Sequence, residues 1–172
     1  MRQIKIYYTL ILIFNLSSSF GQNDDLKSKI ENLKFTKSEF LNCDSDYWKI
    51  IAYKKTAIPY LIEKLNDENI TNAKYKCKTG NLKVGDIAYL ALNEILNIPL
   101  FEVTKVQFDW YENNGCRGGV FNYIENNRNK FKEQVEQYYL KNKLKIKFVK
   151  FKKHDLTKCR IQNKIYGYYN VE

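Results

Sequence analysis

The four cysteines of the chain constrain its fold more than any other feature of the sequence. They lie at positions 43, 77, 116 and 159, far from one another. An even number of cysteines favours two disulfides when a chain folds in an oxidising compartment, and four cysteines allow three pairings. We favour Cys77–Cys116, because these two flank opposite sides of the central predicted helix. Cys43–Cys159 then follows by elimination, although the other pairings stay open.

The beginning of the chain predicts export to such a compartment. Arg2 and Lys5 precede an apolar run from Ile6 to Leu16, and small residues follow up to Gly21. This order is typical of a secretory signal peptide, which we place at residues 1–21 with cleavage after Gly21. The apolar run has about half of the roughly 20 residues that a spanning helix needs. The first cysteine is too far downstream for a lipoprotein. We therefore expect a secreted or periplasmic protein.

Without residues 1–21 the chain keeps 151 of its 172 residues, enough for one domain with a hydrophobic core. The segment that is removed contains two of the 29 basic residues and none of the 19 acidic ones, so the mature chain has a net charge of about +8. Two prolines and seven glycines are few for a β-sandwich or a β-barrel, which need many turns. The composition therefore favours a mainly helical fold.

Hydrophobic periodicity predicts where the helices lie. The strongest signal runs from Val84 to Leu96, where apolar residues recur at the i, i+3, i+4, i+7, i+8 and i+11 positions of a helix face. Asp86 is expected to cap this helix, and we expect burial on two sides. Weaker signals predict further helices at Asp24–Phe35, from Asp44 or Ser45 to Lys55, from Thr56 as a cap to Leu65, at Leu100–Lys105 and at Val120–Leu140. Residues 66–83 are predicted to form a polar loop.

The pattern changes after residue 142. Leu144, Ile146 and Phe148 alternate with lysines, which is the period of a β-strand. The stretch Ile161–Val171 is rich in tyrosine and isoleucine and is its predicted hairpin partner. We expect this basic hairpin, residues 143–172, to pack on a helical domain formed by residues 22–142.

Two of the predicted helices also resemble a known family. The stretch Thr56–Leu65, TAIPYLIEKL, has a proline in its opening turn, and Val84–Ile95, VGDIAYLALNEI, has a Gly-Asp start and an alanine-rich face. Both resemble helices of HEAT repeats, and together they resemble a group of uncharacterised exported bacterial proteins with HEAT-like helices. The resemblance covers roughly residues 44–140 and implies a binding scaffold. The expected fold is thus mainly α, with compact HEAT-like helical pairs, a small C-terminal β-hairpin and two disulfides.

The sequence offers little for catalysis. No two cysteines have the C-x-x-C spacing of zinc sites, and the single histidine, His154, lies in a lysine-rich turn where we expect it to face solvent. Local carboxylate pairs such as Asp44 with Asp46 are expected to cap helices or to face solvent. We predict no catalytic residue, no metal and no cofactor. A hydrolase that acts through two carboxylates is the least favoured alternative.

Two groups of residues are candidates for binding. The first could form a ligand or partner surface around a glycine-rich loop and the central helix, and consists of Trp110, Tyr111, Arg117 and Asn93. Trp48 is instead expected in the core. The second group lies in the basic tail and could bind anions: Lys145, Lys147, Lys150, Lys152 and Lys153. The alternative for the tail is an exposed strand edge whose lysines prevent aggregation.

These features together predict an exported, non-enzymatic binding protein. Its main partner is expected to be another protein, which the sequence does not identify. An anionic lipid or polysaccharide bound through the basic tail is the alternative. Nucleic acid is not expected, because the chain is exported and has no recognition motif for it.

Overall fold

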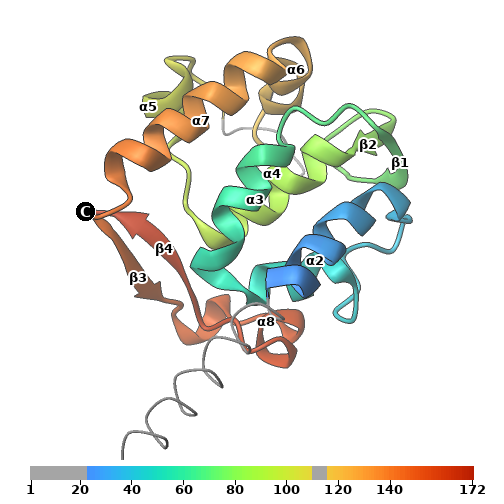
Figure 1. The fold of residues 1–172 in the computed structure, drawn as a ribbon, viewed down its shortest axis with the longest axis vertical. Helices are drawn as coiled ribbons and strands as arrows, with labels where there is room; N and C mark the ends of the chain where they lie inside the picture. Colours follow the sequence, from blue (N-terminus) through green and yellow to red (C-terminus); the bar gives the residue numbers. More distant parts are fainter. Residues whose placement is uncertain (1–22, 110–115) are drawn as a thin grey trace, which may run out of the picture.

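The computed structural model describes residues 23–109 and 116–172 and shows a mainly helical protein (Figure 1). Residues 23–31 are helical. The predicted signal peptide, residues 1–21, lies outside the described residues. The elements that follow are η1 (Asn32–Phe35), α2 (Asp46–Ala52), η2 (Lys54–Ala57), α3 (Ile58–Lys64), β1 (Ile70–Lys74), β2 (Asn81–Lys83), α4 (Val84–Ile95), α5 (Leu100–Thr104), α6 (Val120–Asn126), α7 (Arg128–Asn142), β3 (Ile146–Lys150), η3 (Lys153–Asp155), α8 (Lys158–Gln162) and β4 (Gly167–Val171).

Helix α4 forms the centre of the fold. Its predicted stripe is buried, with Ile87, Ala88 and Leu92 fully inaccessible to solvent. Helices α2 and α3 pack against it, and α7 packs against α3. In α4 itself, Leu90, Asn93 and Glu94 are the residues with more than slight exposure. The prediction that this helix is buried on more than one side is therefore confirmed.

A glycine allows α3 and α4 to approach closely. A Cβ atom at Gly85 would lie 2.4 Å from the backbone oxygen of Leu65, which follows α3. The Gly85 N–H also donates to the backbone oxygen of Asp67 at 3.0 Å. A side chain here would push the start of α4 away from the end of α3. Thr56, the predicted cap of α3, lies instead in η2, and Pro59 lies in the first turn of α3.

The prediction of a polar loop at residues 66–83 was wrong, because this segment contains a β-hairpin. β1 pairs antiparallel with β2, with Ile70 opposite Lys83. Thr71 and Ala73 in β1 face the core, and the Thr71 hydroxyl donates to the backbone oxygen of Leu82 at 2.8 Å. The alternation of buried and exposed residues in β1 is short and weakly apolar. The hairpin is also held by a backbone hydrogen bond from the Asn72 N–H to the Thr36 oxygen at 3.1 Å. Such a distant contact is not visible in local sequence.

Two other predicted elements differ in extent. The helix predicted for Val120–Leu140 is divided at Asn127, whose φ of −138° leaves the helical region, into α6 and α7. The strand predicted from Ile161 begins only at Gly167, because residues 158–162 form α8. The first difference places Arg128 at the start of α7, and the second places Arg160 in α8.

Both favoured disulfides are present. Cys43 is bonded to Cys159, and Cys77 is bonded to Cys116. Two disulfides indicate folding in an oxidising, extracellular or periplasmic environment. Within residues 23–109 and 116–172, no helix has the length and apolar character that crossing a membrane requires.

Candidate functional site

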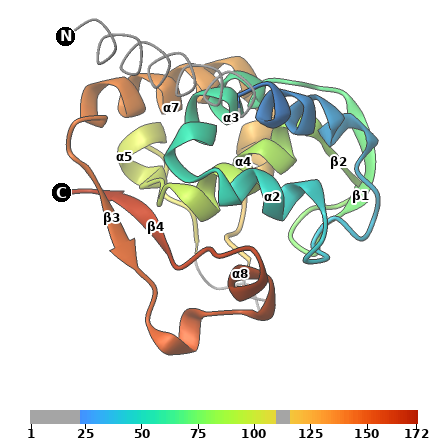
Figure 2. The same cartoon turned by 60° about the horizontal axis from the view of Figure 1, so that its bottom comes forward.

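The basic C-terminal hairpin is the largest charged feature outside the helical core. β3 and β4 are antiparallel and in register from the Ile146–Val171 pair to the Lys150–Gly167 pair. Gly167 is required at the last of these pairs, because a Cβ atom there would lie 2.2 Å from the Val149 oxygen. Views from two directions show β3 on the outer side of β4 (Figures 1 and 2). The hairpin therefore presents β3 at the edge of the molecule.

β4 fixes the hairpin to the end of the central helix. Tyr169 in β4 forms a parallel bridge with Leu96, the residue after α4. The backbone oxygen of Tyr169 accepts from the Asn97 N–H at 3.0 Å. Because Leu96 is fully buried, this contact is continuous with the core. The inner edge of the small sheet is thus occupied.

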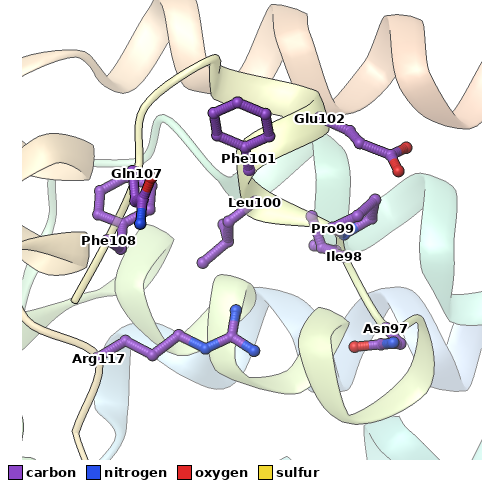
Figure 3. A pocket seen from close by; sticks show the side chains of 9 residues that line it. All are labelled: Asn97, Ile98, Pro99, Leu100, Phe101, Glu102, Gln107, Phe108 and Arg117. Carbon is purple, nitrogen blue, oxygen red and sulfur yellow. The ribbon is translucent and has the colours of Figure 1, made fainter. Parts of the chain in front are cut away.

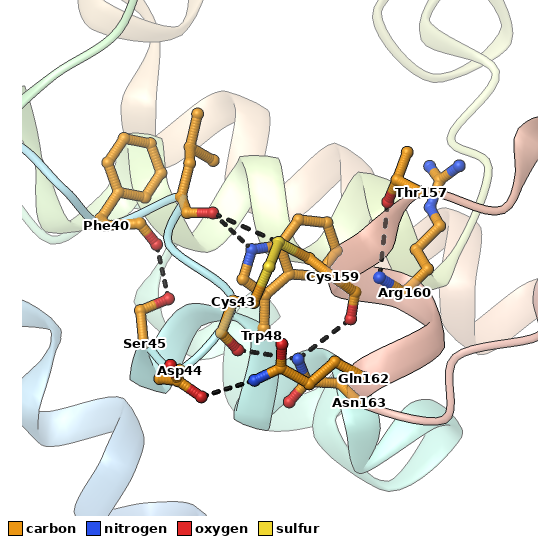
Figure 4. The surroundings of a disulfide bond; sticks show 11 residues. Phe40, Cys43, Asp44, Ser45, Trp48, Thr157, Cys159, Arg160, Gln162 and Asn163 are labelled. Atoms are coloured by element: carbon orange, nitrogen blue, oxygen red, sulfur yellow. Dashed lines mark hydrogen bonds between the residues drawn. A yellow bond between two sulfur atoms is a disulfide. The ribbon is translucent and has the colours of Figure 1, made fainter.

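The Cys43–Cys159 disulfide fixes the segment between β3 and β4 (Figure 4). Asn163 donates to the backbone oxygen of Cys43 at 2.8 Å, and Gln162 donates to Asp44 at 2.5 Å. Beside the disulfide, the Trp48 indole N–H donates to the Leu41 oxygen at 2.9 Å, and Trp48 is 8% exposed. Trp48 is therefore a core residue, as predicted.

Arg160 in α8 makes the third attachment. Its guanidinium lies 2.7 Å from the Glu94 carboxylate of α4 and stacks over the Phe151 ring at 4.2 Å. These residues line a cavity of about 240 Å³ together with Asn93. Asn93 is therefore placed beside the tail, in a cavity that shares Asn97 with the cavity that contains Arg117.

Most lysines of the hairpin lie exposed without an acidic neighbour. Lys147 is bound to the Glu172 carboxylate. The other exposed lysines after Leu144 form no ion pair with any described residue: Lys145, Lys150, Lys152, Lys153, Lys158 and Lys164. We call these six the unpaired lysine set. They give one side of the molecule a positive potential that attracts anions.

Apolar side chains accompany these lysines. The hairpin was expected to pack on the helical domain, but of the three alternating apolar residues only Ile146 is buried, at 7% exposure. Leu144 is 94% exposed and Phe148 is 43% exposed. Ile161 and Tyr166 are about half exposed on the connection between the strands. The surface thus combines positive charge with apolar contact area.

The first predicted group is placed differently. Arg117 lines a cavity of about 460 Å³, in which its side chain extends below Leu100 towards Asn97 (Figure 3). Ile98, Leu100 and Phe108 give this cavity apolar walls, and Glu102 and Gln107 add polar groups. Trp110 and Tyr111 lie outside the described residues. The structure thus places Arg117 and Asn93 in two cavities that both have Asn97 in their lining.

The residues considered for catalysis have structural partners or face water. His154 is 76% exposed and lies 3.5 Å from Asp155. Asp44 accepts from Gln162, and Asp46 lies 3.6 Å from Lys49. Asp67 accepts from the Asn69 N–H at 3.0 Å. In the described part of the chain, no three His, Cys, Asp or Glu side chains gather as metal ligands would.

A buried charge cluster was missed from the sequence. Asp86 is fully buried and contacts both Arg128 and Lys78. It also accepts from the Lys83 N–H at 2.8 Å, so the predicted capping role is confirmed but incomplete. Burial works to raise the pKa of the nearby Glu125, but Lys78 and Lys83 outweigh it and hold that pKa below its usual value. Each charged side chain of this cluster forms an ion pair with another member, as expected of a structural feature.

Comparison with models of protein families, with curated proteins and with solved structures finds no match to this chain. The function of the protein is therefore inferred from its surfaces.

Proposed function

We propose that the protein is an exported, non-catalytic interaction protein that binds an anionic partner through its C-terminal hairpin. The observation that carries this proposal is the unpaired lysine set, held on a hairpin with three attachments to the core. Flexible charged tails also attract anions, but a braced surface loses less conformational entropy on binding. Exposed apolar side chains beside the lysines add contact area for a partner.

The proposal includes two further expectations. Export would use residues 1–21 as a signal peptide with cleavage after Gly21, and the two disulfides support an oxidising destination. A HEAT-like arrangement of α3 and α4 would provide the rigid support, and the packing of these two consecutive helices against each other is consistent with it.

The test compares two variants of the mature, oxidised chain, residues 22–172, on a polyglutamate matrix. The hairpin variant replaces Lys145, Lys150, Lys152 and Lys153 with Gln. The control variant replaces four exposed lysines outside the hairpin with Gln: Lys27, Lys37, Lys74 and Lys130. Both variants lose the same net charge, so a general charge effect would weaken them equally.

We expect the hairpin variant to lose about tenfold or more in affinity at roughly 0.1 M salt, and the control variant about twofold. The affinity of the unchanged protein should also fall steeply between roughly 0.05 and 0.5 M salt, because counterions are released on binding. Equal losses in the two variants would refute a role of the hairpin. Binding that does not depend on salt would refute the electrostatic mechanism.

An anionic lipid surface is the second candidate partner. The observation that favours it is Leu144, which is 94% exposed between two lysines, since membrane-surface segments combine cations with apolar side chains. Vesicles with and without anionic lipid test it. Leu144→Asn should weaken binding to anionic vesicles several-fold and leave polyglutamate binding unchanged. No binding to anionic vesicles would remove this candidate.

A further inference from the structure

The hydrogen-bond register of the C-terminal hairpin identifies which backbone groups of β3 face away from β4. The Phe151 N–H donates to the Tyr166 oxygen at 2.9 Å, and the Glu172 N–H donates to the Lys145 oxygen at 3.4 Å. Hydrogen-bonded and non-hydrogen-bonded pairs alternate along an antiparallel ladder. Residues 145, 147, 149 and 151 therefore bond to β4. The N–H and C=O groups of Ile146, Phe148 and Lys150 point outwards.

This outer edge has no partner in the described part of the chain. No backbone hydrogen bond outside the ladder involves Ile146, Phe148 or Lys150. The opposite edge of the sheet is occupied, because Tyr169 in β4 is bridged to Leu96. Both views show β3 as the outermost strand on this side (Figures 1 and 2). An open strand edge is a template for an added strand.

We propose that the partner of the basic hairpin is an acidic, extended protein segment that adds to the open edge of β3 as a further strand. This inference rests on the proposed function and deepens it, because it names the class of partner and the mode of binding. Three outward N–H groups and three outward C=O groups provide the backbone contacts. The lysines on and around β3 provide the charge.

The lysines decide which kind of strand can add. Side chains of neighbouring strands lie about 5 Å apart on each face of a sheet. A strand beside β3 would have its side chains next to Lys145 and Lys147 on one face, and next to Phe148 and Lys150 on the other. A second copy of β3 would place lysines beside lysines and is disfavoured by repulsion. Acidic side chains at alternate positions are favoured at the same places.

The chain itself contains an example of this pairing. Glu172 directly follows β4, the strand beside β3, and its carboxylate is bound to the Lys147 ammonium group. A carboxylate on a neighbouring strand is thus within reach of a β3 lysine. Lys145 and Lys150 form no such ion pair with the described residues, so an acidic strand on the open edge would complete the pattern. The exposed face of Phe148 would receive an apolar side chain.

The experiment uses the mature, oxidised protein labelled with ¹⁵N and a synthetic peptide of about nine residues that alternates Glu with Thr and Val. Amide hydrogen exchange is measured with and without the peptide. We expect exchange at Ile146, Phe148 and Lys150 to slow by about tenfold, because their N–H groups gain partners. Exchange at Lys147 and Val149 should change little, because these N–H groups already bond to β4.

Two modified peptides separate strand addition from charge attraction. N-methylation of one alternate set of peptide amides should abolish binding, and methylation of the other set should preserve it, since only one set faces β3. A peptide of the same composition interrupted by prolines keeps the charge and cannot form a strand. Equal binding of all these peptides, with no slowing at the three amides, would overturn the strand-addition proposal.

The outcomes also separate this inference from the proposed function. If polyglutamate binds the hairpin variant as tightly as the unchanged protein, both the proposed function and the added strand are refuted. Salt-dependent binding of polyglutamate without protection of the β3 amides removes the added strand and keeps the anionic partner. Binding to anionic vesicles together with failure of the peptide overturns the inference in favour of the lipid surface.

Discussion

The carboxylate of Asp86 in the first turn of α4 lies 2.8 Å from the guanidinium of Arg128 at the start of α7. The second carboxylate oxygen of Asp86 lies 2.7 Å from the ammonium group of Lys78, which directly follows Cys77. All three side chains are less than a tenth exposed. One acidic group thus connects the central helix, α7 and the segment held by the Cys77–Cys116 disulfide.

Replacement of Arg128 by Met should therefore lower the free energy of unfolding by about 3 kcal/mol, because removal of one partner of a buried ion pair leaves the other charge incompletely compensated. Urea denaturation followed by circular dichroism measures the change. Lys130→Met is the matched control, since Lys130 is an exposed cation on the same helix. It should change stability by less than about 0.5 kcal/mol. Equal effects of the two variants would contradict the role of the Asp86 cluster.

This cluster shows why part of the fold could not be predicted from the sequence. The helix at Val84–Ile95 was predicted because its stripe depends only on local spacing. The contact between Asp86 and Arg128 joins residues 42 positions apart, so local spacing around Arg128 does not reveal it. The division between α6 and α7 occurs next to this arginine, where its side chain turns inwards.

The candidate site was predictable in charge and not in geometry. The lysines after residue 142 are evident in the sequence, and the alternation around Ile146 predicted a strand correctly. Which backbone groups of β3 face outwards depends on the register with β4. β4 is in turn bridged to the core through Tyr169 and Leu96. The exposure of Leu144 likewise follows from where the core ends. The strand register and the exposure of Leu144 depend on tertiary contacts, which leave no signal in the local sequence.

The two disulfides should differ in what they stabilise. Cys43 and Cys159 are 116 residues apart, and Cys77 and Cys116 are 39 apart. In the chain-entropy model these crosslinks contribute about 5 and about 4 kcal/mol respectively. The double variant C43S/C159S should therefore lose slightly more stability than C77S/C116S in urea denaturation.

Limited proteolysis tests the local consequence of the same variants. Loss of Cys43–Cys159 removes one of the three attachments of the hairpin, so cleavage between residues 151 and 166 should accelerate. The variant C77S/C116S is the control, because its disulfide lies away from this segment. Equal cleavage rates in this segment would show that Arg160 and β4 suffice to hold it.

Tyr89 should make stability depend on alkaline pH. Its side chain is 5% exposed, and its ring lies against Phe121 and Phe131 with centroids 6.0 and 5.7 Å away. Burial raises the pKa of Tyr89 to about 12, against the opposing effect of Arg117, whereas an unfolded tyrosine ionises near 10. Between pH 10 and pH 12 the unfolded state therefore binds fewer protons than the folded state.

The free energy of unfolding should consequently fall as pH rises through this interval. Ionisation of Tyr89 accounts for about 2–3 kcal/mol of this loss in the free energy of unfolding, because its pKa is raised by about two pKa units. Burial also raises the pKa of Tyr47, so the test compares Tyr89→Phe with the unchanged protein at each pH. Relative to pH 9, the phenylalanine variant should gain stability over the unchanged protein at pH 11.5, because its buried ring has no hydroxyl to ionise. A difference between the two proteins that stays constant across this range would contradict the prediction. It would mean that the Tyr89 hydroxyl ionises as readily in the folded protein as in the unfolded chain, despite its burial between Phe121 and Phe131.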